Sequence, residues 1–237
     1  MFTSGAFAQN LVRSLRQLSV RFEMLDIASL SQRLEKKRMS KPAHPTRVVL
    51  HLRHRQAQKI AEENGFLPTR TVIHMVRSLE EHLPDISAPE GLRSFLPGLD
   101  NQEWLSLNNQ IFAEHPEQGH WNCADLDDRL SQPWFDPNGF LLATHDGKIT
   151  AYCWTKIHGE VGHHGIGEIY VAAVSPDFRG LDLGRAIVVA GLAYLRRKEL
   201  REAMLYVDED NQAAISLYKS IGFTEAGRDV LYQLSID

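Results

Sequence analysis

The 237-residue sequence predicts an α/β fold whose sheet is mixed, mostly antiparallel and flanked by helices. From Asp100 onward, apolar runs typical of strands alternate with helical patterns. Two of these runs flank Asp146-Gly147, a dipeptide typical of hairpin turns. In addition, a strand–turn–helix pattern near the start of the chain recurs near its end. The hairpin requires antiparallel strands, and the alternation with helices requires crossovers, so we expect a mixed sheet.

The first element expected after Asp100 is a helix. Asp100 and Glu103 precede "WLSLNNQIF" with the spacing of an N-cap and a capping box. The last helix is expected to end at Gly222, because glycine readily adopts the conformation that closes a helix. The elements between and after are the hairpin "GFLLATHDGKITAYCWTKIH", the strand "GEIYVAAV", a helix over 184–199, the strand "AMLYVDE", the helix "NQAAISLYKSIGF" and the strand "DVLYQLSI".

Residues 48–66 and 205–223 share the order strand, turn, helix and Gly-Phe at a constant offset of 157 residues (205 minus 48). Ala61 in the first copy occupies the position of Tyr218 in the second. We therefore expect two related units. The first is a partial, non-catalytic unit over 1–85, with an N-terminal helix and a strand–helix–strand over 48–78. The second is a complete domain over 92–237. A linker over 86–98 is expected between them.

The composition argues against several classes of function. Residues 1–80 hold 14 Lys or Arg and 6 Asp or Glu, whereas the remainder holds 12 and 24. The basic residues are scattered without interleaved aromatic residues, so we expect a solvated surface rather than a nucleic-acid site. No apolar run reaches the length of about 18 residues that a membrane span needs. The first 22 residues are explained by an amphipathic helix or by an organelle transit peptide, of which we favour the helix.

Cysteine and histidine give no sign of a disulfide framework or a metal site. Cys123 and Cys153 are distant from each other, which is typical of a protein of the reducing cytoplasm. His158, His163 and His164 lie in or beside a glycine-rich loop and lack carboxylates or cysteines at zinc spacing. We therefore expect no metal.

The segment "RGLDLG", residues 179–184, stands between a strand and a helix. Backbone N–H groups at a helix N-terminus bind phosphate, and glycine lets the backbone approach it. Arg179 adds a cation. The same pattern is also typical of a plain turn in which Asp182 caps the helix, so the motif alone leaves both interpretations open.

The turn and the segments around it resemble the GNAT superfamily of acyl-CoA-dependent N-acyltransferases. The segment "YVDEDNQAAISLYKSIGF" is similar to the closing motif of that family, and "HPEQGHW", "WFDPNGFLLA", "CWTKIH" and "GEIYVAAVSP" resemble the mycothiol synthases within it. The resemblance covers residues 92–234. It implies a GNAT-type sheet preceded by a partial second GNAT-like unit, acetyl-CoA as co-substrate and no metal. It also implies direct acetylation of the cysteinyl amine of cysteinyl-glucosaminyl-inositol.

The resemblance further implies roles for single residues. Glu168 would contact the substrate and deprotonate its amine, and Tyr218 would protonate the CoA thiolate. Glu117, Lys156 and Tyr206 would contact the polar substrate, although ordinary surface or strand positions explain these residues equally well. The implied cofactor-binding residues are Ala172, Ala173, Val174, Arg179, Gly180, Leu181, Asp182, Leu183, Gly184, Arg185, Asn211, Ala213, Ala214 and Ser216.

Asp182 departs from the family pattern, which has glycine at this position. Its carboxylate would repel the CoA pyrophosphate by about 1 kcal/mol at roughly 4 Å in water, or would accept hydrogen bonds from the turn's own amides. Three functions stay open: acetylation of the mycothiol precursor, acetylation of another small amine or a protein N-terminus, and a degenerate, non-catalytic GNAT module. We expect no nucleic-acid or membrane partner. A monomer and self-association that covers the partial unit are both open.

Overall fold

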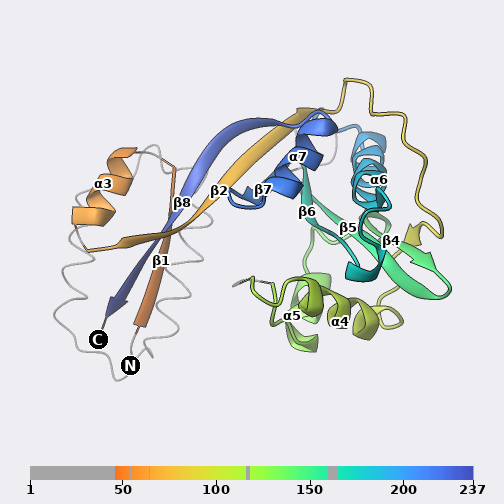
Figure 1. Ribbon diagram of the computed structural model, residues 1–237, viewed down its shortest axis with the longest axis horizontal. Coiled ribbons are helices and arrows are strands. Elements are labelled where there is room, and N and C mark those ends of the chain that lie inside the picture. The colour runs from red at the N-terminus through yellow and green to blue at the C-terminus, as the bar shows by residue number, and fades with distance from the viewer. Residues whose placement is uncertain (1–45, 54, 64, 116–117, 160–164, 237) are drawn as a thin grey trace. The chain divides into compact units, whose positions relative to one another are not determined.

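In the computed structural model, residues 46–53, 55–63, 65–115, 118–159 and 165–236 are described (Figure 1). The expected N-terminal helix falls outside these residues. The chain forms two compact units. Among the described residues, unit 1 comprises those in 46–74, Asp208–Asp210 and 227–236, and unit 2 comprises those in 75–207 and 211–226. No helix in the described ranges is long and apolar enough to cross a membrane.

In unit 1, the helix α3 (Arg55–Glu63) connects the strands β1 (Thr46–Leu52) and β2 (Leu67–Ser78). The strand β8 (Thr224–Ile236) pairs with β1 in antiparallel register along the whole of β1. The division between the two units falls within β2 and within β8. A small core of unit 1 consists of Leu52, Ala61, Phe66 and Tyr232.

The repeat expected from the sequence is present at the same offset. The helices α3 and α7 (Gln212–Ser220) have nine residues each and begin 157 residues apart (212 minus 55). Both end in the same hydrogen bond. The Phe66 amide donates to the Ala61 carbonyl at 3.0 Å, and the Phe223 amide donates to the Tyr218 carbonyl at 3.0 Å. Both copies thus consist of a strand, a helix and a strand, and the division into a partial and a complete domain stays a prediction.

Unit 2 is a sheet with helices on both faces. Its further elements are β3 (Arg93–Ser94), α4 (Asn101–Ile111), α5 (Cys123–Leu130), β4 (Phe140–His145), β5 (Lys148–His158), β6 (Ile166–Val174), α6 (Leu183–Arg197) and β7 (Glu202–Asp208). Its strands follow the order β8-β2-β7-β6-β5-β4-β3. The pairs β3–β4, β4–β5 and β5–β6 are antiparallel, and β6–β7 is parallel. The predicted mixed, mostly antiparallel sheet is thus confirmed. The strand β3 lies within 86–98, where the sequence predicts a linker.

The hairpin between β4 and β5 turns at Asp146-Gly147, as predicted. Asp146 has a φ of 49° and Gly147 a φ of 75°. Two successive residues with positive φ are typical of the type I′ turn, whose twist matches that of the flanking strands. The two-residue turn therefore sets the register of the first two pairs, and beyond Thr144 and Ile149 a bulge at Thr150 shifts it by one residue.

Asp100 precedes α4, but its side chain does not cap the helix, so that prediction is wrong. Asp100 is 3% exposed, and its carboxylate accepts hydrogen bonds from the Arg93 guanidinium at 2.6 and 2.8 Å. This bond to Arg93 lowers the pKa of Asp100. Glu103 makes no capping box either, because its carboxylate accepts the Ile149 amide at 2.8 Å. Asp100 and Glu103 therefore bond to Arg93 and to the Ile149 amide instead of to the first turn of α4.

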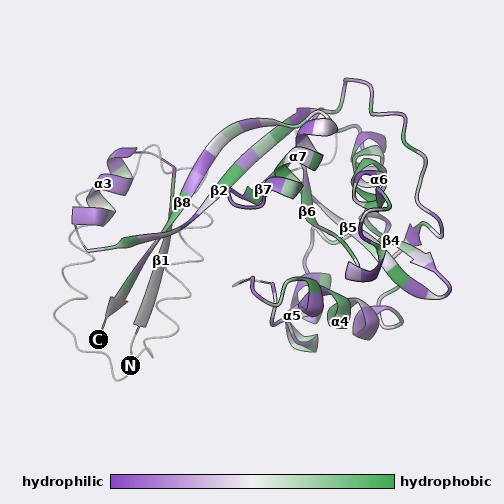
Figure 2. Ribbon diagram, in the orientation of Figure 1, coloured by the Kyte–Doolittle hydropathy of each residue, from purple (hydrophilic) through white to green (hydrophobic). Residues whose placement is uncertain are grey.

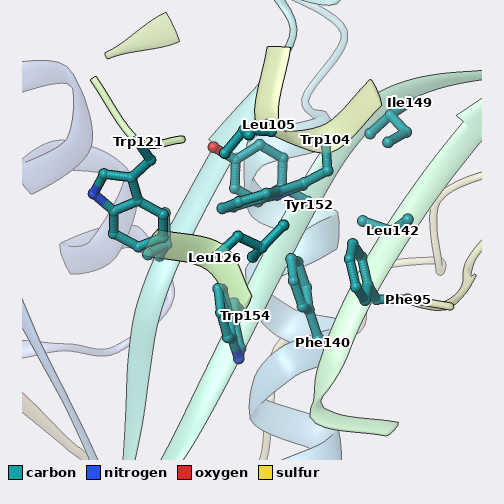
Figure 3. Packing of buried hydrophobic residues seen from close by; sticks show 11 residues of the cluster. Phe95, Trp104, Leu105, Trp121, Leu126, Phe140, Leu142, Ile149, Tyr152 and Trp154 are labelled. Atoms are coloured by element: carbon teal, nitrogen blue, oxygen red, sulfur yellow. The ribbon is translucent and has the colours of Figure 1, made fainter. Parts of the chain in front are cut away.

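An aromatic cluster fills one face of the sheet of unit 2, against α4 and α5 (Figure 3). Trp104 is fully buried and lies edge-on to Phe140, Tyr152 and Trp154, with ring centroids 5.3, 5.5 and 5.7 Å away. Phe140 stacks on Trp154 at 4.3 Å and on Phe95 at 4.2 Å, and Figure 3 shows these three rings in a row. Each such pair contributes about 0.5–1.5 kcal/mol beyond the area that it buries, so the cluster holds α4 to β4 and β5.

The helix α6, mostly hydrophobic in Figure 2, covers the opposite face. It approaches the sheet closely at Gly191. A Cβ there would lie 2.5 Å from the Cys153 sulfur and 3.3 Å from the Ile169 side chain. Because both of these residues are buried, they have little room to move aside. Burial also raises the pKa of Cys153 to about 12, so its thiol stays neutral.

Gly191→Ala is expected to destabilise the chain by about 1 kcal/mol, because overpacking against the Cys153 sulfur outweighs the better helix propensity of alanine. In a Cys153→Ala background the sulfur is absent, so the same substitution should stabilise the chain by up to about 1 kcal/mol. Urea unfolding of the four proteins measures both effects. An equal effect of Gly191→Ala in both backgrounds would contradict the close contact.

Candidate active site

The strands β6 and β7 run parallel and part soon after they begin. Gly167 pairs with Ala203 and Glu168 with Met204, and the described strands pair at no later position. The strand β6 nevertheless continues to Val174. On its β7 side it therefore presents backbone N–H and C=O groups that strand pairing does not use. Such an edge can add an extended ligand as a further strand.

A β-bulge lies in β6 within this opening. The register with β5 shifts between Trp154 and Thr155, so that Tyr170 is an extra residue on β6. A bulge bends its strand and redirects the groups beside it. The predicted cofactor-binding residues of this strand follow the bulge and are half-buried: Ala172, Ala173 and Val174.

The predicted anion-binding turn joins β6 to α6. Gly180 has a φ of 82° and Asp182 a φ of 56°, both in the left-handed region. The amides of the first helical turn follow directly, and a helix has no internal acceptors for them. A cavity of about 350 Å³ opens at this place. Its walls are formed by Val174, Phe178, Arg179, Gly180, Asp182, Leu183, Gly184, Arg185 and Leu217.

Two apolar residues of this cavity, Phe178 and Leu217, were missed by the sequence analysis. Leu217 comes from α7 and approaches α6 so closely that a Cβ at Gly184 would lie 2.8 Å from its side chain. A contact between two helices leaves no local sequence signal, which explains the omission. Leu181, predicted to bind the cofactor, is 65% exposed and does not line the cavity.

Asp182 neither caps α6 nor accepts hydrogen bonds from the amides of the turn, which corrects both of those expectations. It stands at the N-cap position without a side-chain capping bond, and its carboxylate lies 3.4 Å from the Arg185 guanidinium. Glycine is the usual residue at positive φ, and Asp is one of the few others that tolerate it. The positive φ at this position therefore explains why the family pattern has glycine where this chain has Asp182. The buried Nε of Arg185 has no hydrogen-bond partner among the described residues, so it can still donate to an anion.

The second group of predicted cofactor-binding residues begins α7. The Asn211 side chain caps this helix by accepting the Ala214 amide at 3.1 Å. Ala213 and Ser216 are exposed. The helices α6 and α7 follow the carboxyl ends of β6 and β7, which are parallel neighbours. Both helix N-termini therefore lie at the end of the sheet formed by the carboxyl ends of these strands, where open α/β sheets bind their ligands.

Glu168 lies where β6 and β7 part and is 9% exposed. One of its carboxylate oxygens, Oε2, is 2.6 Å from Nε2 of His158 at the end of β5. The sequence analysis considered His158 only as a metal ligand and gave it no role. His158 pairs with Ile166, two residues before Glu168, so the two side chains are diagonal neighbours on one face. This contact depends on the strand register, which the sequence does not show.

Lys156 lies directly opposite Glu168 on the same face. Its ammonium is 4.8 Å from the ring centroid of Trp134 and 5.5 Å from that of Tyr170. Cations over aromatic rings at these distances gain cation–π attraction. The two rings were missed by the sequence analysis, and together with Lys156 they form a polar and aromatic surface beside Glu168.

Tyr206 is 45% exposed and lies on β7. It stands two residues beyond Met204, the partner of Glu168, so it faces the same side of the sheet as Glu168. Glu117, the remaining residue expected to contact the substrate, lies outside the described residues. The structure thus brings Lys156 and Tyr206 to the face that carries Glu168.

Tyr218 lies half-buried on α7, with its ring 5.9 Å from that of Phe223. Desolvation, and to a lesser degree Cys153, raise the pKa of Tyr218. A tyrosine with a raised pKa keeps its proton at neutral pH and can act as a general acid.

In the part of the chain that the structure describes, no group of three or more His, Cys, Asp or Glu side chains could hold a metal ion. The expectation of a metal-free site stays a prediction. The groups available for chemistry in the described site are a buried carboxylate, a protonated tyrosine and the open backbone of β6.

Parted parallel strands, a turn with two left-handed residues and two helix N-termini thus lie together at the carboxyl ends of β6 and β7, which leaves an open backbone beside two anion-binding helix ends. The model of the Acetyltransferase (GNAT) family matches residues 102–223, and the chain belongs to this family. A GCN5-related N-acetyltransferase from Sphaerobacter thermophilus has the same fold. It aligns with a TM-score of 0.68 and 24% identity over 85% of this chain and 64% of that chain.

Within the family, the chain is similar to mycothiol acetyltransferases. That of Thermobispora bispora is 48% identical over 181 residues, which cover 75% of this chain and 61% of that protein. That of Acidothermus cellulolyticus is 43% identical over 190 residues, which cover 75% of this chain and 58% of that protein. The chain thus spans about six tenths of the length of these relatives.

Asp182→Gly is expected to tighten acetyl-CoA binding roughly fivefold. It removes a like charge that costs about 1 kcal/mol near a pyrophosphate, and it releases Arg185. Asp182→Asn removes the charge but keeps a side chain of nearly the same size, so it separates the effect of the charge from the effect of the side chain itself. Calorimetry on the full chain gives the dissociation constants.

The matched control for this prediction is Glu199→Gly. Glu199 is also an exposed acid with positive φ, 60°, but it lies at the other end of α6. This substitution should leave the affinity unchanged. An unchanged dissociation constant in Asp182→Gly, or an equal gain in the control, would refute the repulsion.

Proposed function

We propose that the chain is an acetyl-CoA-dependent N-acetyltransferase. Its acceptor would be the cysteinyl amine of cysteinyl-glucosaminyl-inositol, in the last step of mycothiol biosynthesis. The observation that carries the proposal is the buried carboxylate of Glu168 at the point where β6 and β7 part. The acceptor is supported by the name of the relatives, which are mycothiol acetyltransferases 43% and 48% identical to the chain.

The described residues fit acetyl-CoA, which supplies the acetyl group when it is bound. The amides at the start of α6, with Arg179 and Arg185, suit the pyrophosphate. The backbone of β6 beyond Glu168 suits an extended pantetheine arm. Asp182 opposes this fit, but its ion pair with Arg185 at 3.4 Å offsets part of the charge.

Glu168 would take a proton from the substrate ammonium, because only the neutral amine can attack a thioester. The amides of Ala172 and Val174 would stabilise the negative charge that develops on the thioester oxygen. Tyr218 would give its proton to the departing thiolate. The ammonium loses two protons in all. One replaces the proton that Tyr218 gives to the CoA thiolate, and the other leaves the site through Glu168.

The face that carries Glu168 suits a hydroxyl-rich amine. Lys156 and the hydroxyl of Tyr206 can hydrogen-bond to sugar oxygens, and the rings of Trp134 and Tyr170 offer apolar surface. The acidic balance after residue 80 favours a cationic substrate at long range.

Full-length protein with acetyl-CoA and cysteinyl-glucosaminyl-inositol is expected to release free CoA thiol and to form the N-acetyl product, measured by a thiol reagent and by mass spectrometry. A panel of other small amines and N-terminal peptides serves as the comparison. Faster turnover of one of these would reassign the acceptor. A lack of thiol release with every amine would favour the second candidate, a non-catalytic GNAT module, which the charge of Asp182 supports.

Tyr218→Phe is expected to lower kcat by about 10²-fold, because the thiolate would lose its proton donor, while the dissociation constant of acetyl-CoA should not change. Steady-state kinetics and calorimetry separate the two. Tyr232→Phe is the control, since that hydroxyl bonds to Glu62 in unit 1 at 2.6 Å. Full activity of Tyr218→Phe would remove Tyr218 from the mechanism.

A further inference from the structure

We infer that His158 is a positioning residue for Glu168: its imidazole holds one carboxylate oxygen and leaves the other to take the proton of the substrate. The inference rests on the proposed function, because that function makes Glu168 the base. It adds a residue to the site that neither the sequence motifs nor the family resemblance assigned.

The geometry is a short contact between a buried and a half-exposed group. Oε2 of Glu168 and Nε2 of His158 are 2.6 Å apart. The side chain of Glu168 is 12% exposed and that of His158 is 37% exposed. The diagonal register of β5 and β6 holds both side chains on one face. The strand register therefore keeps the two side chains within reach of each other.

A proton must lie between the two atoms, because two bare acceptors repel each other at this distance. With Glu168 ionised, Nε2 of His158 carries that proton and donates it to Oε2. The second oxygen, Oε1, accepts no hydrogen bond from the described residues. Oε1 is consequently the oxygen that can receive a proton from a bound amine.

The other polar groups on this face do not replace His158. The Lys156 ammonium is directed over the rings of Trp134 and Tyr170. Arg129 of α5 donates to the Tyr170 hydroxyl at 3.4 Å and to a carbonyl of its own helix. Tyr206 faces the same side from β7. Without His158, the Glu168 carboxylate would thus lose its hydrogen-bond partner among the described residues while staying buried, and it would be free to turn away from the amine.

His158→Leu is expected to lower kcat for the amine about tenfold, which corresponds to the loss of a hydrogen bond to a charged group. The KM for acetyl-CoA should not change. His158→Gln should restore most of kcat, since its amide N–H can donate to the same oxygen.

The matched control is His145→Leu. His145 also contacts a glutamate, Glu90, at 3.0 Å, but at the exposed end of β4. It should not change kcat. A merely structural role of His158 would lower the amount of folded protein and leave the kcat of the folded protein unchanged. An unchanged kcat in folded His158→Leu protein, or a lack of rescue by His158→Gln, overturns the inference.

A second measurement needs no turnover. Imidazole nitrogen NMR of the full chain should show the Nε2–H form of His158, assigned by its absence in His158→Gln, and Glu168→Leu should shift this signal. A signal unaffected by Glu168→Leu overturns the contact. Inactivity of the wild type with every amine would refute the proposed function instead, while the NMR result would still decide the contact.

Discussion

The parting of β6 and β7 after Glu168 is the constraint on which the site depends. Parallel strands that stayed paired would use their backbone groups on each other and leave no edge for a ligand. Because these two separate, β6 keeps open N–H and C=O groups as far as Val174. Because they are parallel, both following helices begin at the same end of the sheet. Glu168 occupies the last paired position, so one carboxylate is buried where the opening starts.

The two faces of the sheet beside this opening are packed in different ways. On one face, α6 packs so closely at Gly191 that the helix spacing is set by the Cys153 sulfur and the Ile169 side chain. On the other, the stacked rings of Phe95, Phe140 and Trp154 tie β3, β4 and β5 into one rigid layer. A site whose side chains must meet within fractions of an ångström needs such supports behind it.

Local chemistry was readable in the sequence, whereas partners across the sheet were not. The Asp146-Gly147 hairpin and the offset of the repeat follow from turn residues and periodicity, and both are present. The cap expected at Asp100 fails because Arg93, seven residues earlier, competes for the same carboxylate through a fold that no local pattern encodes. His158 was missed for the same reason: its contact with Glu168 follows from the register of β5 and β6. The positions of CoA-binding and substrate-binding residues follow from the family motifs, and their roles stay predictions.

The two copies of the strand–helix–strand repeat share their backbone features but differ at the position of Tyr218. Both copies have a nine-residue helix, a glycine with positive φ, and a phenylalanine amide that bonds back five residues. At the residue whose carbonyl accepts that bond, the first copy has Ala61, 2% exposed in a small core, and the second has Tyr218. The closing bond uses only the backbone, so either side chain satisfies the fold. A hydroxyl in the core of unit 1 would need a partner, whereas alanine needs none. The proton donation that we propose for Tyr218 therefore has no counterpart in the first copy, although both copies share the backbone frame.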